Sequence, residues 1–176
     1  GYTDKILYVN VGSVEIKSKD VPAQMKEKFI GGKGYGLRLL WDAVTPNTRW
    51  NDSENEIIIA GGPICGITQY SGTGKSLVVS LSPQTHIPID SKVGGFFGPF
   101  LKIACFDALE LQGKADKDVV IFIDAATGHV EIFEDPGFKR DSHLLAEELT
   151  DLFANDDKDR KNIGIVSAGD AADHSL

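Results

Sequence analysis

Cysteine, histidine and methionine are scarce in this sequence of 176 residues, and their scarcity excludes several kinds of site. The two cysteines, Cys65 and Cys105, lie far apart among apolar residues. An iron–sulfur cluster ordinarily needs four cysteines, so this chain cannot hold one. We expect both thiols to be buried and reduced, as in cytoplasmic proteins. No zinc ligand set is visible, because no histidine has a cysteine or another histidine at ligand spacing; the histidines are His86, His129, His143 and His174.

Positive charge is also limited, with 18 Lys plus Arg against 26 Asp plus Glu and a net charge of −8. This balance argues against a nucleic-acid partner or an anionic membrane surface, since both require clustered positive charge. No apolar run approaches the ~20 residues of a membrane-spanning helix. The first residues carry no apolar signal region, so we expect a cytoplasmic protein. The acidic run at 156–159 lacks the spacing of a calcium loop and is expected to be solvated.

The remaining pattern predicts strands and helices in an irregular order. A hairpin turn at 11–12 joins the first two strands, Pro22 begins a helix that stops at Gly31, and a second helix follows Gly36. Asp141 or Ser142 caps a later helix. Strands are expected at 5–10, 13–17, 57–60, 77–81, 108–111, 119–123, 129–133 and 162–166, and the strand at 57–60 is expected to be buried on both faces. A further helix is expected at 96–105, and loops are expected at 45–48 and 155–161. Hairpins dominate this order, which predicts an α+β fold with mainly antiparallel sheets and interspersed helices.

One glycine-rich loop, residues 71–76, resembles part of a nucleotide-binding loop. The full pattern requires a glycine at the position of Gln69 and a helix directly afterwards. Leu77 and the valines after it instead predict a strand. An ATP or GTP site is therefore not expected. A loop that presents its backbone and Lys75 to an anionic ligand remains possible.

Other glycine-rich segments frame the predicted strands. Residues 31–36 lie between two helices, either as a tight connection or as backbone that approaches a cofactor or another domain. The loops at 61–66, 71–75 and 94–98 alternate with strands. If they gather at one edge of a sheet, their N–H groups can bind an anion.

Several blocks of sequence resemble a known family. The glycine pair Gly94–Gly95 opens an apolar run to Leu109, followed by Gln112, Gly113, Lys114 and Ala115. Together with residues 5–10, 29–36, 62–66 and 82–85, these blocks resemble the N-terminal domain of the tungsten-containing aldehyde ferredoxin oxidoreductase family. Cys65, Gly66 and residues 82–85 look closest to a branch that includes the tungsten subunit of aromatic acyl-CoA reductases.

The resemblance implies a base for a tungsten ion held by two pterin dithiolenes. Lys75 matches a basic residue that approaches the cofactor's phosphate region, and lysine offers a point charge there instead of arginine's fork. Lys92 matches a residue whose backbone carbonyl binds a magnesium ion that bridges the pterin phosphates. No side-chain metal ligand and no catalytic residue is expected. The implied cofactor-binding residues are Gly74, Lys75, Ser91, Lys92, Val93, Gly94 and Gly95.

Parts of the family's machinery have no counterpart in this chain. An Arg- and Gly-rich loop would follow Gly169, and the cysteines that hold a four-iron cluster lie in later domains. Residues 1–176 are thus expected to be a single tungstopterin-platform domain, truncated at its C-terminal end and inactive alone. The parent would oxidise aldehydes or reduce acyl substrates, with ferredoxin as electron partner, and the partners of this chain would be the remaining domains or another subunit. The alternative is a non-catalytic assembly module without cofactor, which Thr73, Lys75 and Lys92 in place of the family's usual residues favour.

Overall fold

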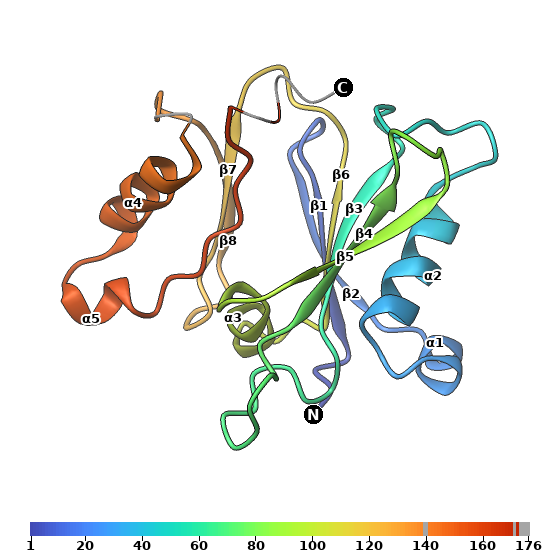
Figure 1. The fold of residues 1–176 in the computed structure, drawn as a ribbon, viewed down its shortest axis with the longest axis horizontal. Coiled ribbons are helices and arrows are strands. Elements are labelled where there is room, and N and C mark those ends of the chain that lie inside the picture. The colour runs from blue at the N-terminus through green and yellow to red at the C-terminus, as the bar shows by residue number, and fades with distance from the viewer. Residues whose placement is uncertain (139–140, 171, 173–176) are drawn as a thin grey trace.

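The main element of the fold is a six-stranded sheet (Figure 1). The computed structural model describes residues 1–138, 141–170 and 172. The strands are β1 (Lys5–Asn10), β2 (Glu15–Asp20), β3 (Glu56–Ala60), β4 (Ser76–Leu81), β5 (Pro88–Val93) and β6 (Ala108–Gln112). Their spatial order is β2-β1-β6-β3-β4-β5. Only the β1–β6 pair among these strands is parallel, so the predicted antiparallel character is confirmed.

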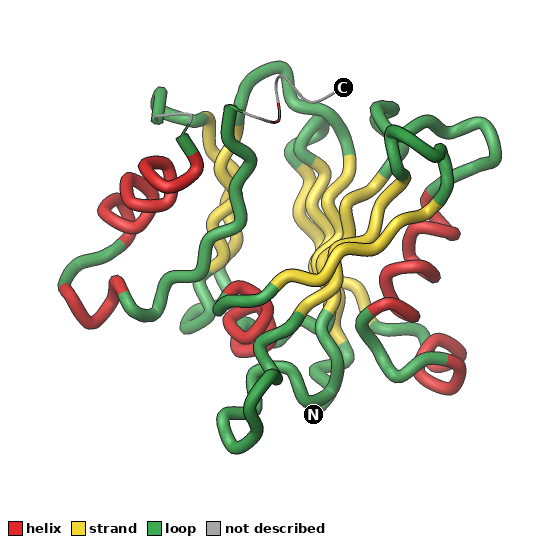
Figure 2. Tube along the Cα trace, in the orientation of Figure 1, coloured by secondary structure: helices red, strands yellow, loops and turns green. Residues whose placement is uncertain are grey.

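A second, two-stranded sheet and five helices complete the described part of the chain (Figure 2). The sheet pairs β7 (Val119–Ile123) with β8 (Val130–Glu134) in antiparallel register. The helices are α1 (Ala23–Lys28), α2 (Lys33–Ala43), α3 (Phe97–Ile103), α4 (Ser142–Phe153) and α5 (Asp157–Arg160). This composition confirms the predicted α+β class. None of the helices in the described ranges is both long and apolar enough to cross a bilayer.

The large sheet separates two apolar cores, because side chains alternate between its faces. Ile6 of β1 packs with Leu40 of α2 on one face, whereas Leu7 packs with Leu101 of α3 and with β7 and β8 on the other. Figure 1 shows α1 and α2 on the first side, and α3, β7 and β8 on the second. Fully burying a side chain such as Leu40 contributes about 1.5–3 kcal/mol. The two cores therefore fix the sheet from both sides.

The start of α2 differs from the prediction, since Gly34 and Gly36 lie inside the helix and not before it. A Cβ atom at Gly36 would lie 2.6 Å from Val79 Cγ2, and one at Gly34 would lie 2.8 Å from Phe29 Cβ. Both glycines let the helix approach its neighbours closely. Packing thus outweighs the low helix propensity of glycine, about 1 kcal/mol per residue.

Other differences concern short or exposed segments. β5 was not predicted, because its sequence is polar and begins with Pro88. β3 is not buried on both faces, since Ile57 is 47% exposed. Residues 162–166 form no strand, and the predicted loop contains α5, which Asp156 caps by accepting hydrogen bonds from two backbone N–H groups. Asp141 caps α4 as predicted.

Candidate functional site

The glycine-rich segments meet at one end of the large sheet, where β3 ends and β4 begins. The N–H of Gly66 donates to the carbonyl of Thr73 at 3.0 Å, which joins the loops at 61–66 and 71–75. The N–H of Gly32 donates to the carbonyl of Gly61 at 2.9 Å, which adds the segment at 31–36. A Cβ atom at Gly66 would lie 3.3 Å from Pro99 Cα, so the segment that begins α3 also packs here. The gathering expected from the sequence is present.

The β4–β5 pairing brings the predicted cofactor-binding residues together. Ser76 pairs with Val93, so the chain segments just outside the hairpin, 74–75 and 94–95, lie side by side. A Cβ atom at Gly94 would lie 3.1 Å from the Nζ atom of Lys75, and one at Gly74 would lie 3.1 Å from the carbonyl oxygen of Gly95. The other predicted residues, Ser91 and Lys92, lie within β5 opposite Val78 and Leu77. The two stretches, 74–75 and 91–95, therefore lie next to each other at this end of the β4–β5 hairpin, and the side chain of Lys92 lies on the opposite face from those of Ser91 and Val93.

Two glycines at this surface are required for different structural reasons. Gly95 has φ of +93° with open space around its missing Cβ, so its backbone conformation alone requires glycine. Gly98, in the first turn of α3, is buried, and a Cβ atom there would lie 1.9 Å from Ser76 Oγ. The first glycine shapes the loop, and the second allows α3 to pack against the start of β4.

The surface carries positive charge without a compensating carboxylate. Lys75 and Lys92 are exposed, and neither forms an ion pair with any residue that the structure describes. The nearby Lys33, in contrast, pairs with Asp90 of β5. In a chain with a net charge of −8, the unpaired Lys75 ammonium beside glycine backbone suits an anionic ligand. The Lys92 side chain lies on the same face of β5 as Asp90, the partner of Lys33.

A buried ion pair between Asp107 and Lys102 lies next to the glycine loops and helps to hold them in place. The Asp107 side chain, 1% exposed, pairs with Lys102 of α3 and accepts a hydrogen bond from the N–H of Asp4 at 2.8 Å. The Asp107 carbonyl accepts from the N–H of Gly61 at 3.1 Å. One residue thus ties the N-terminal segment, α3 and a glycine loop together.

The two cysteines differ in environment, which corrects one prediction. Cys65 is buried beside Gly61, and burial raises the pKa of its thiol. Cys105 is exposed, in a left-handed turn with φ of +67° directly after α3. Apolar neighbours in the sequence did not bury it, because its turn directs it to solvent. His129 and His143 are exposed as expected, and His174 lies outside the described residues.

The glycine loop at 71–76 leads into β4 and not into a helix. A phosphate loop needs a helix N-terminus there, so this geometry excludes that fold for the segment. Only Gly31 and Gly32 of the segment at 31–36 belong to the connection between α1 and α2, because α2 begins at Lys33. Within the part of the chain that the structure describes, no group of three or more His, Cys, Asp or Glu residues could hold a metal ion.

Sequence reasoning missed a buried acidic pair at the opposite end of the sheet. Glu56 and Glu110 are each 3% exposed, on adjacent strands β3 and β6. Burial and the neighbouring Glu110 raise the pKa of Glu56 to about 8. A signal was present for Glu110, which stands between two leucines in β6, whereas Glu56 is the first residue of β3 and follows polar residues.

Comparison with known families gives a match over nearly the whole chain. The model for the aldehyde ferredoxin oxidoreductase N-terminal domain matches residues 6–176. The tungsten-containing aldehyde ferredoxin oxidoreductase of Pyrococcus horikoshii is 32% identical over 176 residues, which is 100% of this chain and 28% of that protein. The enzyme of the same name from Pyrococcus furiosus is 31% identical over 177 residues, covering 99% of this chain and 28% of its own length.

The chain is also similar to one further curated protein and to one solved structure. The aliphatic sulfonate oxidoreductase WOR-like subunit of Pyrococcus furiosus is 31% identical over 127 residues, which is 69% of this chain and 20% of that protein. Among solved structures, the active-site complex BamBC of benzoyl coenzyme A reductase with 1,5-dienoyl-CoA matches with a TM-score of 0.78. The identity there is 30%, over 86% of this chain and 23% of that one. The chain therefore spans about 28% of the length of the first curated relatives it matches.

Proposed function

Because this chain belongs to the aldehyde ferredoxin oxidoreductase N-terminal domain family, we propose that it is the platform on which a larger oxidoreductase seats a tungsten pterin cofactor. The proposal depends on one observation, which is the meeting of four glycine-rich segments beside Lys75 at one end of the sheet. Relatives that are named tungsten-containing enzymes support the choice of metal.

The residues present fit the phosphate groups of such a cofactor. A Cβ atom at Gly94 would lie 3.1 Å from the Lys75 ammonium, so glycine leaves the backbone beside this ammonium open to close approach by a ligand. The unpaired Lys75 ammonium would bind phosphate as a point charge, with glycine N–H groups as additional donors. Gly74 and Gly95 complete this part of the proposed site. When bound, the cofactor supplies the redox chemistry, and the chain binds and orients it.

We assign the magnesium contact to the backbone of Lys92 and not to its side chain. Cross-strand partners lie on the same face of a sheet, and Lys92 is the partner of Leu77. The Leu77 side chain lies 3.5 Å from the position of a Cβ at Gly32, next to the start of α2. The Lys92 side chain is therefore on the α2 face of the sheet, and its carbonyl is the group we propose for magnesium. Ser91 and Val93 flank it.

The rest of the proposed enzyme lies outside residues 1–176. We propose that the parent oxidises aldehydes or reduces acyl substrates, and that a four-iron cluster and ferredoxin carry the electrons. The chain contributes no catalytic acid or base in this scheme, and it is one platform domain that is inactive alone. Its coverage of 28% of the first relatives supports a role within a larger assembly.

The test compares Lys75→Ala with Lys28→Ala in the complete enzyme. Lys28 is an exposed lysine in the last turn of α1, and its side chain has no hydrogen bond or ion pair with the glycine loops in the described ranges, so it provides a matched loss of charge. We expect Lys75→Ala to reduce pterin and tungsten content, measured by pterin fluorescence after oxidation and by elemental mass spectrometry, while Lys28→Ala does not. Equal content in both variants would refute the assignment of Lys75.

The isolated chain gives a second test of the same proposal. Residues 1–176 alone are expected to contain neither tungsten nor iron at stoichiometric levels, since the remaining supports are proposed to lie elsewhere. Stoichiometric iron in the isolated chain would overturn the platform proposal. A complete protein that folds but never binds pterin would instead favour the non-catalytic assembly module.

A further inference from the structure

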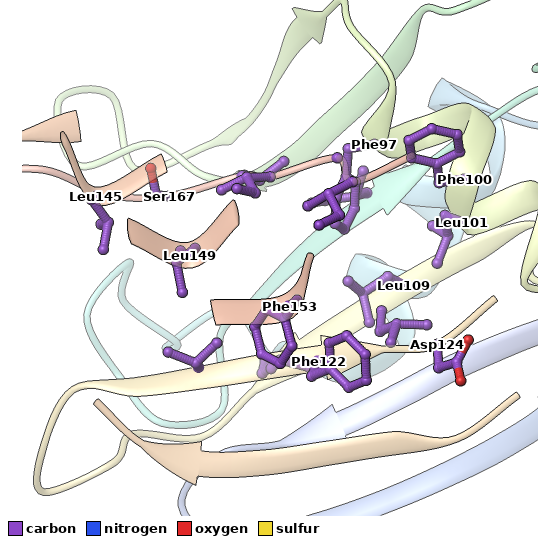
Figure 3. Close-up of a pocket in the computed structure, with 18 of the residues that line it drawn as sticks. Phe97, Phe100, Leu101, Leu109, Phe122, Asp124, Leu145, Leu149, Phe153 and Ser167 are labelled. Atoms are coloured by element: carbon purple, nitrogen blue, oxygen red, sulfur yellow. The ribbon is translucent and has the colours of Figure 1, made fainter. Parts of the chain in front are cut away.

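A large apolar cavity lies between the two sheets. Its volume is about 820 Å³, and it is bounded by the large sheet, α3, β7, α4 and the segment at 163–169. Figure 3 shows apolar side chains lining it from several elements, among them Phe97, Leu101, Leu109, Leu149 and Phe153. The cavity is partly open to solvent, and an apolar lining of this extent is typical of an interaction surface.

β7 lacks the covering that its sequence requires. All five of its residues are apolar, a pattern typical of strands buried on both faces. Each of them is only half-buried, although Phe122 stacks on Phe153 of α4 at 4.3 Å between ring centroids. An isolated two-stranded sheet is marginally stable in water. The β7–β8 sheet therefore has apolar surface left to bury.

The segment at 163–168 borders the same cavity and has a free backbone. Its sequence predicts a strand, yet none of its N–H or C=O groups bonds to the backbone of another described residue. A Cβ atom at Gly164 would lie 2.9 Å from the Phe97 N atom, so the segment packs closely against α3. Val166 is 48% exposed. The segment is held in place, and no residue in the described ranges pairs with its backbone.

The apolar surface continues beyond the cavity onto the large sheet. Ile59 and Leu111 line the cavity, and Ile57, the cross-strand partner of Leu111, is 47% exposed on the same face. Further along this face, Ile89 of the edge strand β5 is 52% exposed opposite Ser80. Exposed apolar area that adjoins a cavity is typical of an interaction surface.

We propose that this cavity is an interface that receives an apolar β-strand from the part of the enzyme outside residues 1–176. The incoming strand pairs with the edge of residues 163–168, and its inward side chains fill the space against β7 and α3. Strand addition supplies the backbone partners that an apolar small molecule cannot provide. The first curated relatives carry most of their length outside the matched region, so such a segment has a source. The proposal needs no bound cofactor.

Thiol labelling tests the proposal in the complete enzyme and in residues 1–176 alone. Val166→Cys is expected to react in the isolated chain and to lose its reactivity in the complete enzyme, with labelled peptides identified by mass. Asn47→Cys, at an exposed position in the α2–β3 loop, is the control and should react in both. Amide hydrogen exchange of residues 163–168 should slow in the complete enzyme in parallel. Labelling of Val166→Cys in the complete enzyme would overturn the proposal.

A charge substitution provides an independent check. Val166→Asp should leave the melting temperature of the isolated chain unchanged, because the side chain is half-exposed there, and should lower that of the complete enzyme. Val14→Asp, in the β1–β2 turn with 65% exposure and φ of +55°, should shift both melting temperatures alike, because aspartate tolerates that conformation better than a β-branched residue. If Val166→Asp prevents assembly altogether, that loss also supports the interface. An unchanged complete enzyme would contradict it.

Other occupants give different results. If a second copy of residues 1–176 fills the cavity, the isolated chain will associate as its concentration rises, and its sedimentation coefficient will increase. The cysteine of Val166→Cys will then lose its reactivity in the isolated chain as well. If an apolar ligand fills it, exchange at 163–168 stays fast in the complete enzyme. Either result overturns the proposal, whereas pterin content is unaffected by both and tests the platform function separately.

Discussion

Glu56 and Glu110 lie on one face of the large sheet, on neighbouring strands, with each residue only 3% exposed. Lys19 of the edge strand β2 forms an ion pair with Glu110. Glu56 Oε2 has no hydrogen-bond partner among the described residues. Two buried carboxylates with one ammonium cannot both be ionised without cost, so Glu56 holds a proton at neutral pH.

This pair predicts a loss of stability as pH rises. Burial and Glu110 raise the pKa of Glu56 from 4.5 to about 8, with Lys19 opposing them, and burial also raises the pKa of Glu110. Between pH 4.5 and about pH 8, Glu56 keeps its proton in the folded state and releases it in the unfolded state. The free energy of unfolding therefore falls as the pH rises through this range. Asp42 of α2 adds negative charge to the same environment.

Glu56→Gln removes the titrating group and should flatten this profile. We expect the variant to gain stability relative to the unmodified chain as pH rises from 4.5 to 8, by up to a few kcal/mol, since one pKa unit corresponds to about 1.4 kcal/mol. Urea denaturation across this pH range measures the difference. Glu54→Gln, at an exposed position nearby, is the control. Parallel pH profiles for Glu56→Gln and the unmodified chain would refute the prediction.

Asp107→Asn should destabilise the chain strongly. The substitution leaves the Lys102 ammonium buried without a counter-ion, because the Lys102 side chain is only 11% exposed. Removing one partner of a buried pair typically costs about 3–5 kcal/mol. Chemical denaturation measures the loss, and the double variant with Lys102→Met should recover part of it.

An exposed ion pair provides the comparison for Asp107→Asn. Lys117 and Glu134 pair at 2.7 Å with both side chains more than half exposed. Glu134→Gln should change the stability by no more than about 1 kcal/mol. A similarly small effect of Asp107→Asn would show that the buried pair does not hold the glycine loops in place.

The sequence predicted most strands correctly because their residues alternate or form short apolar runs. β1, β4, β6 and β7 occur where that pattern places them. β5 escaped prediction because its sequence is polar and begins with Pro88, so its strand character comes from pairing with β4 across the loop at 82–87. The predicted strand at 162–166 has the right local sequence but no described neighbour to pair with. Local pattern therefore identifies a strand only where the fold also supplies a partner.

The gathering of the glycine loops was predictable from the sequence, but the ion pair that supports them was not. The glycine loops that alternate with the predicted strands indicated an edge of the sheet where backbone groups gather. In the structure, Lys75 lies beside Gly94 at this edge. The Asp107–Lys102 pair that holds the loops was not predictable, because only the folded chain brings Thr3 and Asp4 to the same carboxylate. The cofactor role of these residues stays a prediction.

Magnesium and ATP should not stabilise the chain. The glycine loop at 71–76 precedes β4, so no helix N-terminus faces a nucleotide phosphate there. A ligand at one hundred times its Kd would raise the free energy of unfolding by about 2.7 kcal/mol and would shift the melting temperature clearly. A thermal-shift experiment with magnesium and ATP is expected to show no change. A concentration-dependent rise would mean that the loop binds nucleotide in another geometry.

Gly36→Ala should destabilise the chain, although alanine is the better helix former. Propensity alone favours alanine by about 1 kcal/mol. The new Cβ, however, would lie 2.6 Å from Val79 Cγ2, in the buried contact between α2 and β4. Overpacking of this kind typically costs about 1–3 kcal/mol and should dominate. The variant Gly36→Ala with Val79→Ala relieves the clash, so it should be more stable than the sum of the two single effects in a denaturant double-mutant cycle. Simple additivity would mean that α2 moves away from the sheet without strain, and that the close approach at Gly36 is not required by the packing of the core.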